Sequence, residues 1–159
     1  MAVGKLSFEN ARIIFRNFSG RGTKFNAEGK RNFCVVIEDP ATAQQLNEDG
    51  WNVRMLAPRD PDDPPTYYMT VALGYEYRPP EVYLVTGRAP HFKKTALTEE
   101  TVGNLDYADI VSCDITIRPY NWEIGGNSGV KAYLASLYAV VEEDEFAGKY
   151  DDPDEGIPF

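Results

Sequence analysis

The stretch Glu9-Asn-Ala-Arg-Ile-Ile-Phe-Arg-Asn-Phe18 alternates between two kinds of side chain. The apolar set on one face of an extended chain is Ala11, Ile13 and Phe15. The opposite face carries Arg12, Ile14, Arg16 and Phe18. This pattern predicts a half-buried β-strand whose outer face is basic and partly aromatic. Residues 30–38 alternate in the same way, so the two stretches predict a long hairpin around a glycine-rich loop at 19–29.

The remaining elements extend this hairpin into a larger β-fold. Three more long strands are expected, at residues 66–77, 110–118 and 130–141. A capping aspartate and a terminal glycine predict a short helix at 39–50, and a capping threonine followed by two glutamates predicts another at 98–106. Three strands, a helix and two strands are the order of an OB-fold barrel. We therefore predict an all-β, OB-fold-like β-barrel with two short helices, although a barrel or sandwich of another topology fits the same order.

Shorter segments complete the prediction. Residues 51–57 and 81–86 are expected to be short inserted strands, and residues 87–94 and 119–129 are expected to be loops. The domain is predicted to span residues 1–145, followed by a disordered acidic tail at 146–159. The tail prediction depends on composition, because four carboxylates, two prolines and a glycine at 151–159 leave little apolar surface to offset chain entropy.

Charge is unevenly distributed along the chain. The net charge is −9 over 159 residues, which by itself argues against a nucleic-acid-binding domain. However, residues 142–159 hold eight acidic residues and one lysine, whereas residues 12–31 hold six basic residues and one acidic residue. Residues 78–94 form a second basic segment, with four basic residues and one glutamate. Such segregation predicts a cationic surface that the average conceals.

Composition argues against several other classes of protein. The two cysteines, Cys34 and Cys113, lie in strand-like runs and are expected to be buried free thiols. With a single histidine, His91, a structural zinc site has few ligands, and neither a metal nor another cofactor is predicted. No run approaches the ~20 apolar residues of a membrane span, and the N-terminal residues lack the apolar block of a signal peptide. A cytoplasmic protein without a membrane partner is expected.

Two resemblances sharpen the functional expectation. Residues 151–159, Asp-Asp-Pro-Asp-Glu-Gly-Ile-Pro-Phe, resemble the acidic Ile-Pro-Phe tip of bacterial single-stranded DNA-binding proteins, which docks on replication and repair proteins. Arg16-Asn-Phe-Ser-Gly, Gly50-Trp-Asn-Val-Arg and Asp114-Ile-Thr-Ile-Arg-Pro-Tyr-Asn-Trp-Glu resemble a family of bacteriophage single-stranded DNA-binding proteins. These likenesses imply an OB-like protein of phage replication, recombination or repair in the cytoplasm of an infected host.

Sequence-independent binding of single strands requires cations that follow the phosphates and aromatic rings on which bases stack. The candidates in the first hairpin are Arg16, Phe18, Arg21, Lys24, Phe25, Lys30 and Arg31. Those of the second basic segment are Arg88, Lys93 and Lys94. Those of the last two strands and the loop between them are Arg118, Tyr120, Trp122, Lys131 and Tyr133. The candidates for partner docking are Asp151, Asp152, Asp154, Glu155, Ile157, Pro158 and Phe159.

The residues also allow other classes of protein. A metal-dependent nuclease would use carboxylates such as Asp106, Asp109 and Asp114, although their spacing matches no known two-metal motif. A phage structural or assembly protein with a docking tail would be β-rich and acidic, but it leaves the basic hairpin without a role. We therefore expect a non-enzymatic protein that binds single-stranded DNA and replication proteins, and self-association into a homo-oligomer is compatible with this pattern.

Overall fold

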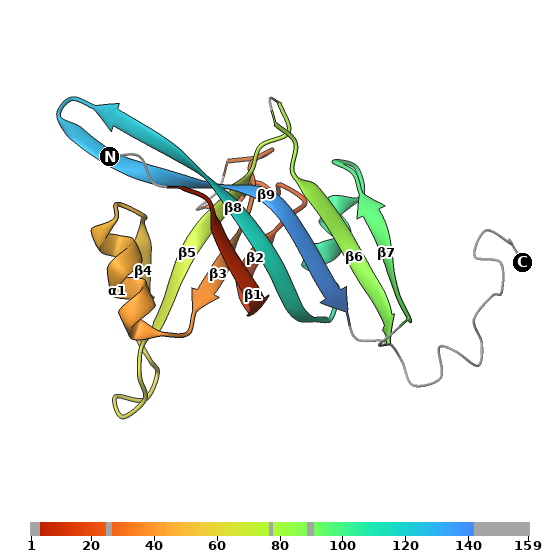
Figure 1. Cartoon of the computed structure of the whole chain (residues 1–159), viewed down its shortest axis with the longest axis horizontal. Helices are drawn as coiled ribbons and strands as arrows, with labels where there is room; N and C mark the ends of the chain where they lie inside the picture. Colours follow the sequence, from red (N-terminus) through yellow and green to blue (C-terminus); the bar gives the residue numbers. More distant parts are fainter. Residues whose placement is uncertain (1–3, 25–26, 77, 89–90, 142–159) are drawn as a thin grey trace, which may run out of the picture.

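The computed structural model describes residues 4–24, 27–76, 78–88 and 91–141, as a β-rich body with one α-helix at its side (Figure 1). The predicted tail at 146–159 lies entirely outside the described residues. The first strands are β1 (Leu6–Ala11), β2 (Ile13–Asn17), β3 (Arg31–Ile37), β4 (Val53–Leu56) and β5 (Thr66–Leu73). The later strands are β6 (Glu81–Arg88), β7 (His91–Leu97), β8 (Ile110–Ile124) and β9 (Asn127–Val141). The helices are α1 (Pro40–Glu48) and the 3-10 helix η1 (Val102–Asp106).

The strands pair in an order that closes the sheet on itself. The path runs β1-β8-β9-β5-β3-β2. Its two ends, β1 and β2, are consecutive in the sequence and separated only by Arg12, whose carbonyl accepts a hydrogen bond from Val36 N–H at 2.9 Å. β5 and β9 are parallel, whereas β2–β3, β3–β5, β8–β9 and β1–β8 are antiparallel. The predicted OB-like order of strands is therefore present, with α1 and β4 inserted between β3 and β5.

The core fills the space inside this closed sheet. Phe18 and Phe33 stack with ring centroids 5.1 Å apart and are fully buried. Trp51, Ile115 and Leu137 are also buried, and together they belong to one continuous cluster. Burial of a large side chain of this kind contributes about 1.5–3 kcal/mol relative to exposure. The packed interior makes the barrel a rigid support for the side chains on its outer face.

The predicted first strand is interrupted, and this changes which residues face outward. The pairing register between β2 and β3 shifts between Ile14 and Asn17, and Phe15 has a positive φ of 52°. Such a bulge reverses the alternation of the strand. Phe15 is therefore 57% exposed, and Phe18 is buried. The prediction that Phe18 is available to stack on DNA is wrong, because its ring forms part of the core.

The predicted loop at 119–129 is a regular extension of two strands. β8 and β9 continue in register to the pair Ile124–Asn127, and only Gly125 and Gly126 form the turn. Both glycines have positive φ values, 57° and 86°, as the favoured two-residue hairpin turns require. We call residues 119–129 the arm, which projects away from the barrel (Figure 1).

Two further segments differ from the prediction. Residues 91–94 belong to strand β7, which pairs with β6 along a hairpin in which Arg88 lies opposite His91. The predicted basic loop at 87–94 is therefore mostly strand. The helix expected at 98–106 is only the short η1, preceded by a turn in which Val102 N–H donates to the carbonyl of Thr98 at 2.8 Å. The helix at α1 is confirmed, with the Asp39 carboxylate accepting a hydrogen bond from Ala41 N–H.

Both cysteines are free and buried, as predicted. Burial raises the pKa of the Cys113 thiol to about 12, and it also raises the pKa of Cys34. No helix in the described part of the chain has the length and apolar content to cross a membrane.

Candidate nucleic-acid interface

Cations and aromatic rings line one face of the β8–β9 hairpin. Arg118, Tyr120 and Trp122 alternate along β8 and pair with Tyr133, Lys131 and Gly129 of β9. The Tyr120 and Tyr133 rings lie edge to face with centroids 6.2 Å apart, and Lys131 Nζ lies 5.1 Å from the Tyr133 centroid. We call Arg118, Tyr120, Trp122, Lys131 and Tyr133 the arm face. The structure thus brings together all five residues that the sequence predicted in this region.

The arm face continues onto the barrel through β5. Ala72 of β5 pairs with Tyr133, and Thr70 and Tyr68 follow at alternate positions. Tyr68 contacts the exposed ring of Phe15 edge to face at 5.6 Å, and it pairs with Arg54 of β4. OB-folds bind oligonucleotides on the face of their second and third strands, which are β3 and β5 here.

Sequence reasoning missed three residues of this surface: Phe15, Tyr68 and Arg54. In the sequence, Tyr68 alternates with Tyr67 and Met69 within the expected strand at 66–77, and this alternation was an available signal. Phe15 could not be found, because the bulge that exposes it leaves the apolar alternation of the sequence intact. Arg54 lies on a four-residue inserted strand. The face of the sheet on which its side chain lies depends on how that strand pairs with β5.

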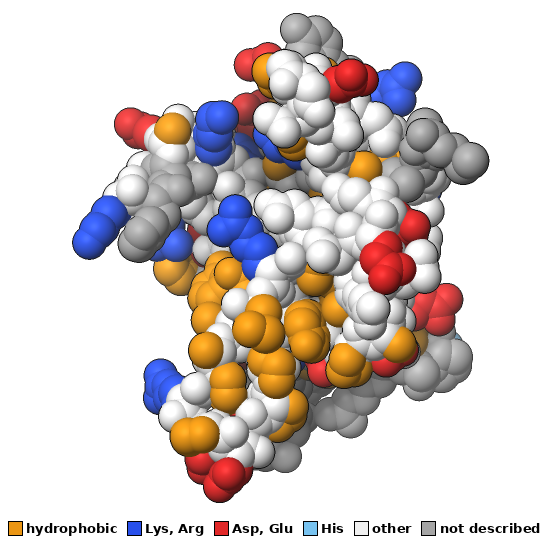
Figure 2. All heavy atoms as spheres, turned by 90° about the vertical axis from the view of Figure 1, so that its left-hand side faces the viewer, with side chains coloured by type: hydrophobic (Ala, Val, Ile, Leu, Met, Phe, Trp, Pro, Cys, Tyr) orange, Lys and Arg blue, Asp and Glu red, His pale blue; other side chains and the backbone are white. Residues whose placement is uncertain are grey.

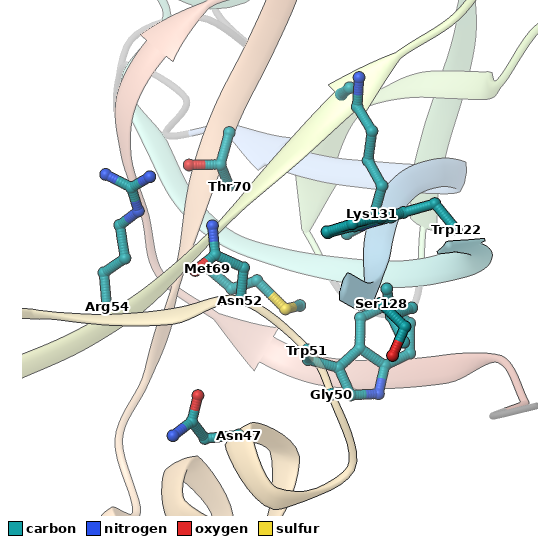
Figure 3. A pocket seen from close by; sticks show the side chains of 14 residues that line it. Asn47, Gly50, Trp51, Asn52, Arg54, Met69, Thr70, Trp122, Ser128 and Lys131 are labelled. Atoms are coloured by element: carbon teal, nitrogen blue, oxygen red, sulfur yellow. The ribbon is translucent and has the colours of Figure 1, made fainter. Parts of the chain in front are cut away.

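A groove opens beside this face. It lies where β4 and β9, which pair with successive parts of β5, diverge from each other. Its volume is about 750 Å³. Arg54 and Thr70 lie on one side, and Lys131 and Trp122 lie on the other (Figure 3). Figure 2 views the side of the molecule that bears α1 and the arm, where hydrophobic side chains gather and several Lys and Arg side chains lie around them.

The first hairpin uses part of its charge to build the fold. Arg16 Nη1 donates to the carbonyls of Leu105 and Ala108 at 2.8 and 2.7 Å. Arg31 Nη1 donates to the carbonyl of Phe18 at 2.6 Å, and its guanidinium lies 5.9 Å from the Tyr75 ring centroid. Burial is the main cause of a raised Tyr75 pKa, which the nearby Arg31 opposes. Two of the predicted phosphate contacts therefore hold η1 and the adjoining loops in place.

Asp106 ties this hairpin to η1. Its side chain is only 1% exposed. The carboxylate accepts hydrogen bonds from Phe18 N–H at 2.6 Å, Ser19 N–H at 3.2 Å and Ser19 Oγ at 2.6 Å. Arg21 Nη2 lies 3.9 Å from the same carboxylate. This network fixes the start of the 19–29 loop.

The loop beyond this point carries the other predicted cations. Arg21, Lys24 and Lys30 are exposed, and each also interacts within the protein. Phe25 lies outside the described residues.

The second basic segment lies elsewhere on the barrel. β6 pairs with residues 136–140 of β9, whereas the arm face begins at residue 133 and runs to the opposite end of that strand. Lys94 Nζ lies 4.6 Å from the ring centroid of Tyr83, which stacks on Tyr138. Arg88 and Lys93 lie on the same β6–β7 hairpin. The fold thus does not join this segment to the arm face, and Figure 1 shows the arm and the β6–β7 hairpin at opposite sides of the body.

Two of the three carboxylates of the nuclease alternative have other roles. Asp106 is occupied by the loop network, and Asp114 Oδ1 accepts a hydrogen bond from Asn10 N–H at 3.0 Å. Within the described ranges, no group of three or more His, Cys, Asp or Glu side chains could hold a metal ion.

Comparison with known proteins adds independent evidence. A family model described as a putative phage ssDNA-binding domain matches residues 1–158. The fold is similar to that of the single-stranded DNA-binding protein of bacteriophage Enc34 in a C-terminally truncated form. That match has a TM-score of 0.57 and 14% identity, and covers 89% of this chain and 87% of the other. A structure of the Enc34 protein in complex with ssDNA matches with a TM-score of 0.54 and 15% identity, covering 90% and 89%. No curated protein matches the chain significantly.

Proposed function

Because the chain belongs to the family of phage single-stranded DNA-binding domains, we propose that it coats and protects single-stranded DNA, without sequence preference, during phage replication, recombination and repair. Proteins of this family bind single-stranded DNA and are not enzymes. The host cytoplasm is the expected site of action.

The observation that carries this proposal is the surface formed by the arm face and β5. Arg118 and Lys131 supply charge for the phosphates, and Tyr120, Trp122 and Tyr133 supply rings within the same face. Every base has a π-face, so stacking on such rings does not depend on sequence. Exposed cations of the 19–29 loop would extend the cationic track beyond the rigid barrel.

A salt titration with single- and double-stranded oligonucleotides tests the proposal. We expect tighter binding to single strands. The logarithm of the binding constant should fall with the logarithm of salt concentration at a slope of roughly −2 to −4, because each neutralised phosphate contributes about −0.7. A flat salt dependence or tighter binding to duplex DNA would overturn the proposal.

We further propose that residues 151–159 recruit replication and recombination proteins. The support is chemical: Ile157, Pro158 and Phe159 form a stiff apolar group next to Asp151, Asp152, Asp154 and Glu155, which suits a hydrophobic pocket with a basic rim.

The Phe159→Ala variant separates docking from DNA binding. Capture of phage and host replication proteins should fail, whereas affinity for DNA should hardly change, because the charge of the tail is unaltered. A variant that captures these proteins as well as the parent would contradict the proposed docking role.

A further inference from the structure

We propose that the groove between the α1–β4 insertion and the arm holds the base of one nucleotide of the bound strand, stacked on Trp122 and hydrogen-bonded by Asn47 or Asn52. This inference rests on the proposed function and assigns a role to an insertion that is not part of the OB-like order of strands. Its residues Asn47, Asn52 and Arg54 were not among the sites predicted from sequence.

The floor of the groove is closed by contacts between the insertion and strand β9 just beyond the arm. Trp51 forms a parallel bridge with Val130, and Val130 N–H donates to the carbonyl of Gly50 at 3.0 Å. Trp51 is itself only 2% exposed. The two walls are therefore fixed relative to each other, so a base that enters needs little rearrangement of the protein.

The charge of the groove suits a nucleotide. Arg54 and Lys131 lie on its two sides, and none of the described residues that line it is acidic. This is notable in a chain with 25 acidic residues. The adjoining smaller groove, by contrast, is lined by Asp49 and Glu123. A phosphate is thus favoured beside Arg54 and Lys131 and disfavoured beyond Trp122, which limits the site to about one nucleotide.

Trp122 is held in position by Gly129. A Cβ atom placed on Gly129 would lie 2.8 Å from Trp122 Cζ2 and 3.0 Å from Cε2, so the indole lies directly on the glycine backbone. Trp122 nevertheless stays 36% exposed and lines the groove. Close backing by the backbone restricts the ring, and a ring that is already ordered loses little entropy when a base stacks on it.

The insertion contributes polar side chains to the lining of the groove. Asn47 and Asn52 are exposed and line the groove, and Figure 3 shows Asn52 between Arg54 and Trp122. Within the described part of the chain, neither side-chain amide has a hydrogen-bond partner. An amide offers both donors and an acceptor. It can therefore pair with the edge of any base, in keeping with binding that does not select a sequence.

An abasic oligonucleotide tests the site, because it keeps the phosphates and removes one base. A strand just long enough for one protein is titrated with the abasic position moved along it, against the intact strand. For the parent protein, one position should cost about tenfold in affinity, since base stacking is worth about 1–3 kcal/mol. For Trp122→Ala, the intact strand should bind about as weakly as that abasic strand, and removing the base should cost little more.

Two substitutions on the insertion complete the test. Arg54→Ala should weaken binding and reduce the salt slope by about 0.7. Its control, Arg59→Ala, removes the same charge from an exposed loop residue that does not line the groove, and should leave the slope unchanged. Asn52→Ala should reduce the penalty of the abasic position while leaving the salt slope intact.

The outcomes separate this inference from the proposed function. If the parent does not bind single strands, the proposed function fails. If it binds, but every abasic position costs the same in the parent and Trp122→Ala, or if Arg54→Ala behaves like Arg59→Ala, then the nucleotide site is wrong and the general binding function stands. Urea unfolding of each variant verifies that the barrel is intact.

Discussion

The first hairpin and the arm have similar chemistry but contribute to the molecule in opposite ways. Both combine arginines with aromatic rings. In the hairpin, Arg16 and Arg31 donate to backbone carbonyls and Phe18 is buried. On the arm face, the side chains of Arg118, Tyr120 and Trp122 lie on one outward side of β8, and the backbone pairing of β8 with β9 does not depend on them. The most basic segment of the sequence thus does not offer all of its charge for binding, because Arg16 and Arg31 stabilise the fold.

The strongest test of this contrast is the Asp106→Ala variant. It would leave Phe18 N–H and Ser19 N–H without their acceptor in a partly buried site. We expect a loss of about 2 to 4 kcal/mol in the free energy of unfolding, measured by urea denaturation. Asp109→Ala, which removes an exposed carboxylate nearby, is the matched control and should change stability by less than about 0.5 kcal/mol. Equal effects would show that the hairpin does not depend on this network.

A pair of arginine variants should show the opposite pattern in stability and binding. Arg16→Ala removes two short hydrogen bonds to the carbonyls of Leu105 and Ala108, and should cost about 1.5–3 kcal/mol in stability. Arg118→Ala should leave stability within about 0.5 kcal/mol and reduce the salt slope of DNA binding by about 0.7. Urea denaturation and a salt titration of both variants make the comparison. The contrast between hairpin and arm is wrong if Arg16→Ala weakens DNA binding as much as Arg118→Ala in a buffer without urea, where both variants are folded.

Two exposed tyrosines give the finest comparison. Tyr120 of the arm is 58% exposed, and Tyr107, beside Arg21 of the hairpin, is 76% exposed. Tyr120→Ala should cost about 1–3 kcal/mol in binding if the ring stacks on a base. Tyr107→Ala should cost less than about 0.5 kcal/mol, because among the described residues no second ring or aligned strand face accompanies it. Fluorescence titration with a labelled oligonucleotide measures the affinity of both variants. Equal losses of binding free energy would show that bases stack near the hairpin as well as on the arm face.

Sequence reasoning found the order of the major strands because alternation and apolar runs report burial directly. It also found Cys34 and Cys113 as buried thiols. It failed where a local distortion changes the facing of a strand, as at Phe15, because a bulge is specified by backbone geometry and not by hydrophobic pattern. It failed again in the arm, where Pro119 and the Gly125–Gly126 tip were interpreted as a whole loop and proved to be strand and turn.

The arm face itself could be predicted. Arg118, Tyr120 and Trp122 occupy every second position. Residues spaced in this way lie on one face of an extended chain, so the face could be predicted even though residues 119–129 were expected to form a loop. The groove could not be predicted, because Asn52 and Arg54 meet Trp122 only through the pairing of β4 and β9 with the same strand. Contacts of that kind depend on topology, which no local pattern contains.

Strand β7 has a consequence for how charge variants should be interpreted. Within the described chain it pairs only with β6 and is exposed along almost its whole length. An open edge of this kind is a template for aggregation, and lysines along it discourage pairing with a second molecule. Lys93 and Lys94 lie in the middle of that edge. Removing their charge can therefore lower solubility, so an apparent loss of DNA affinity in such variants requires a light-scattering control before it is attributed to the phosphates.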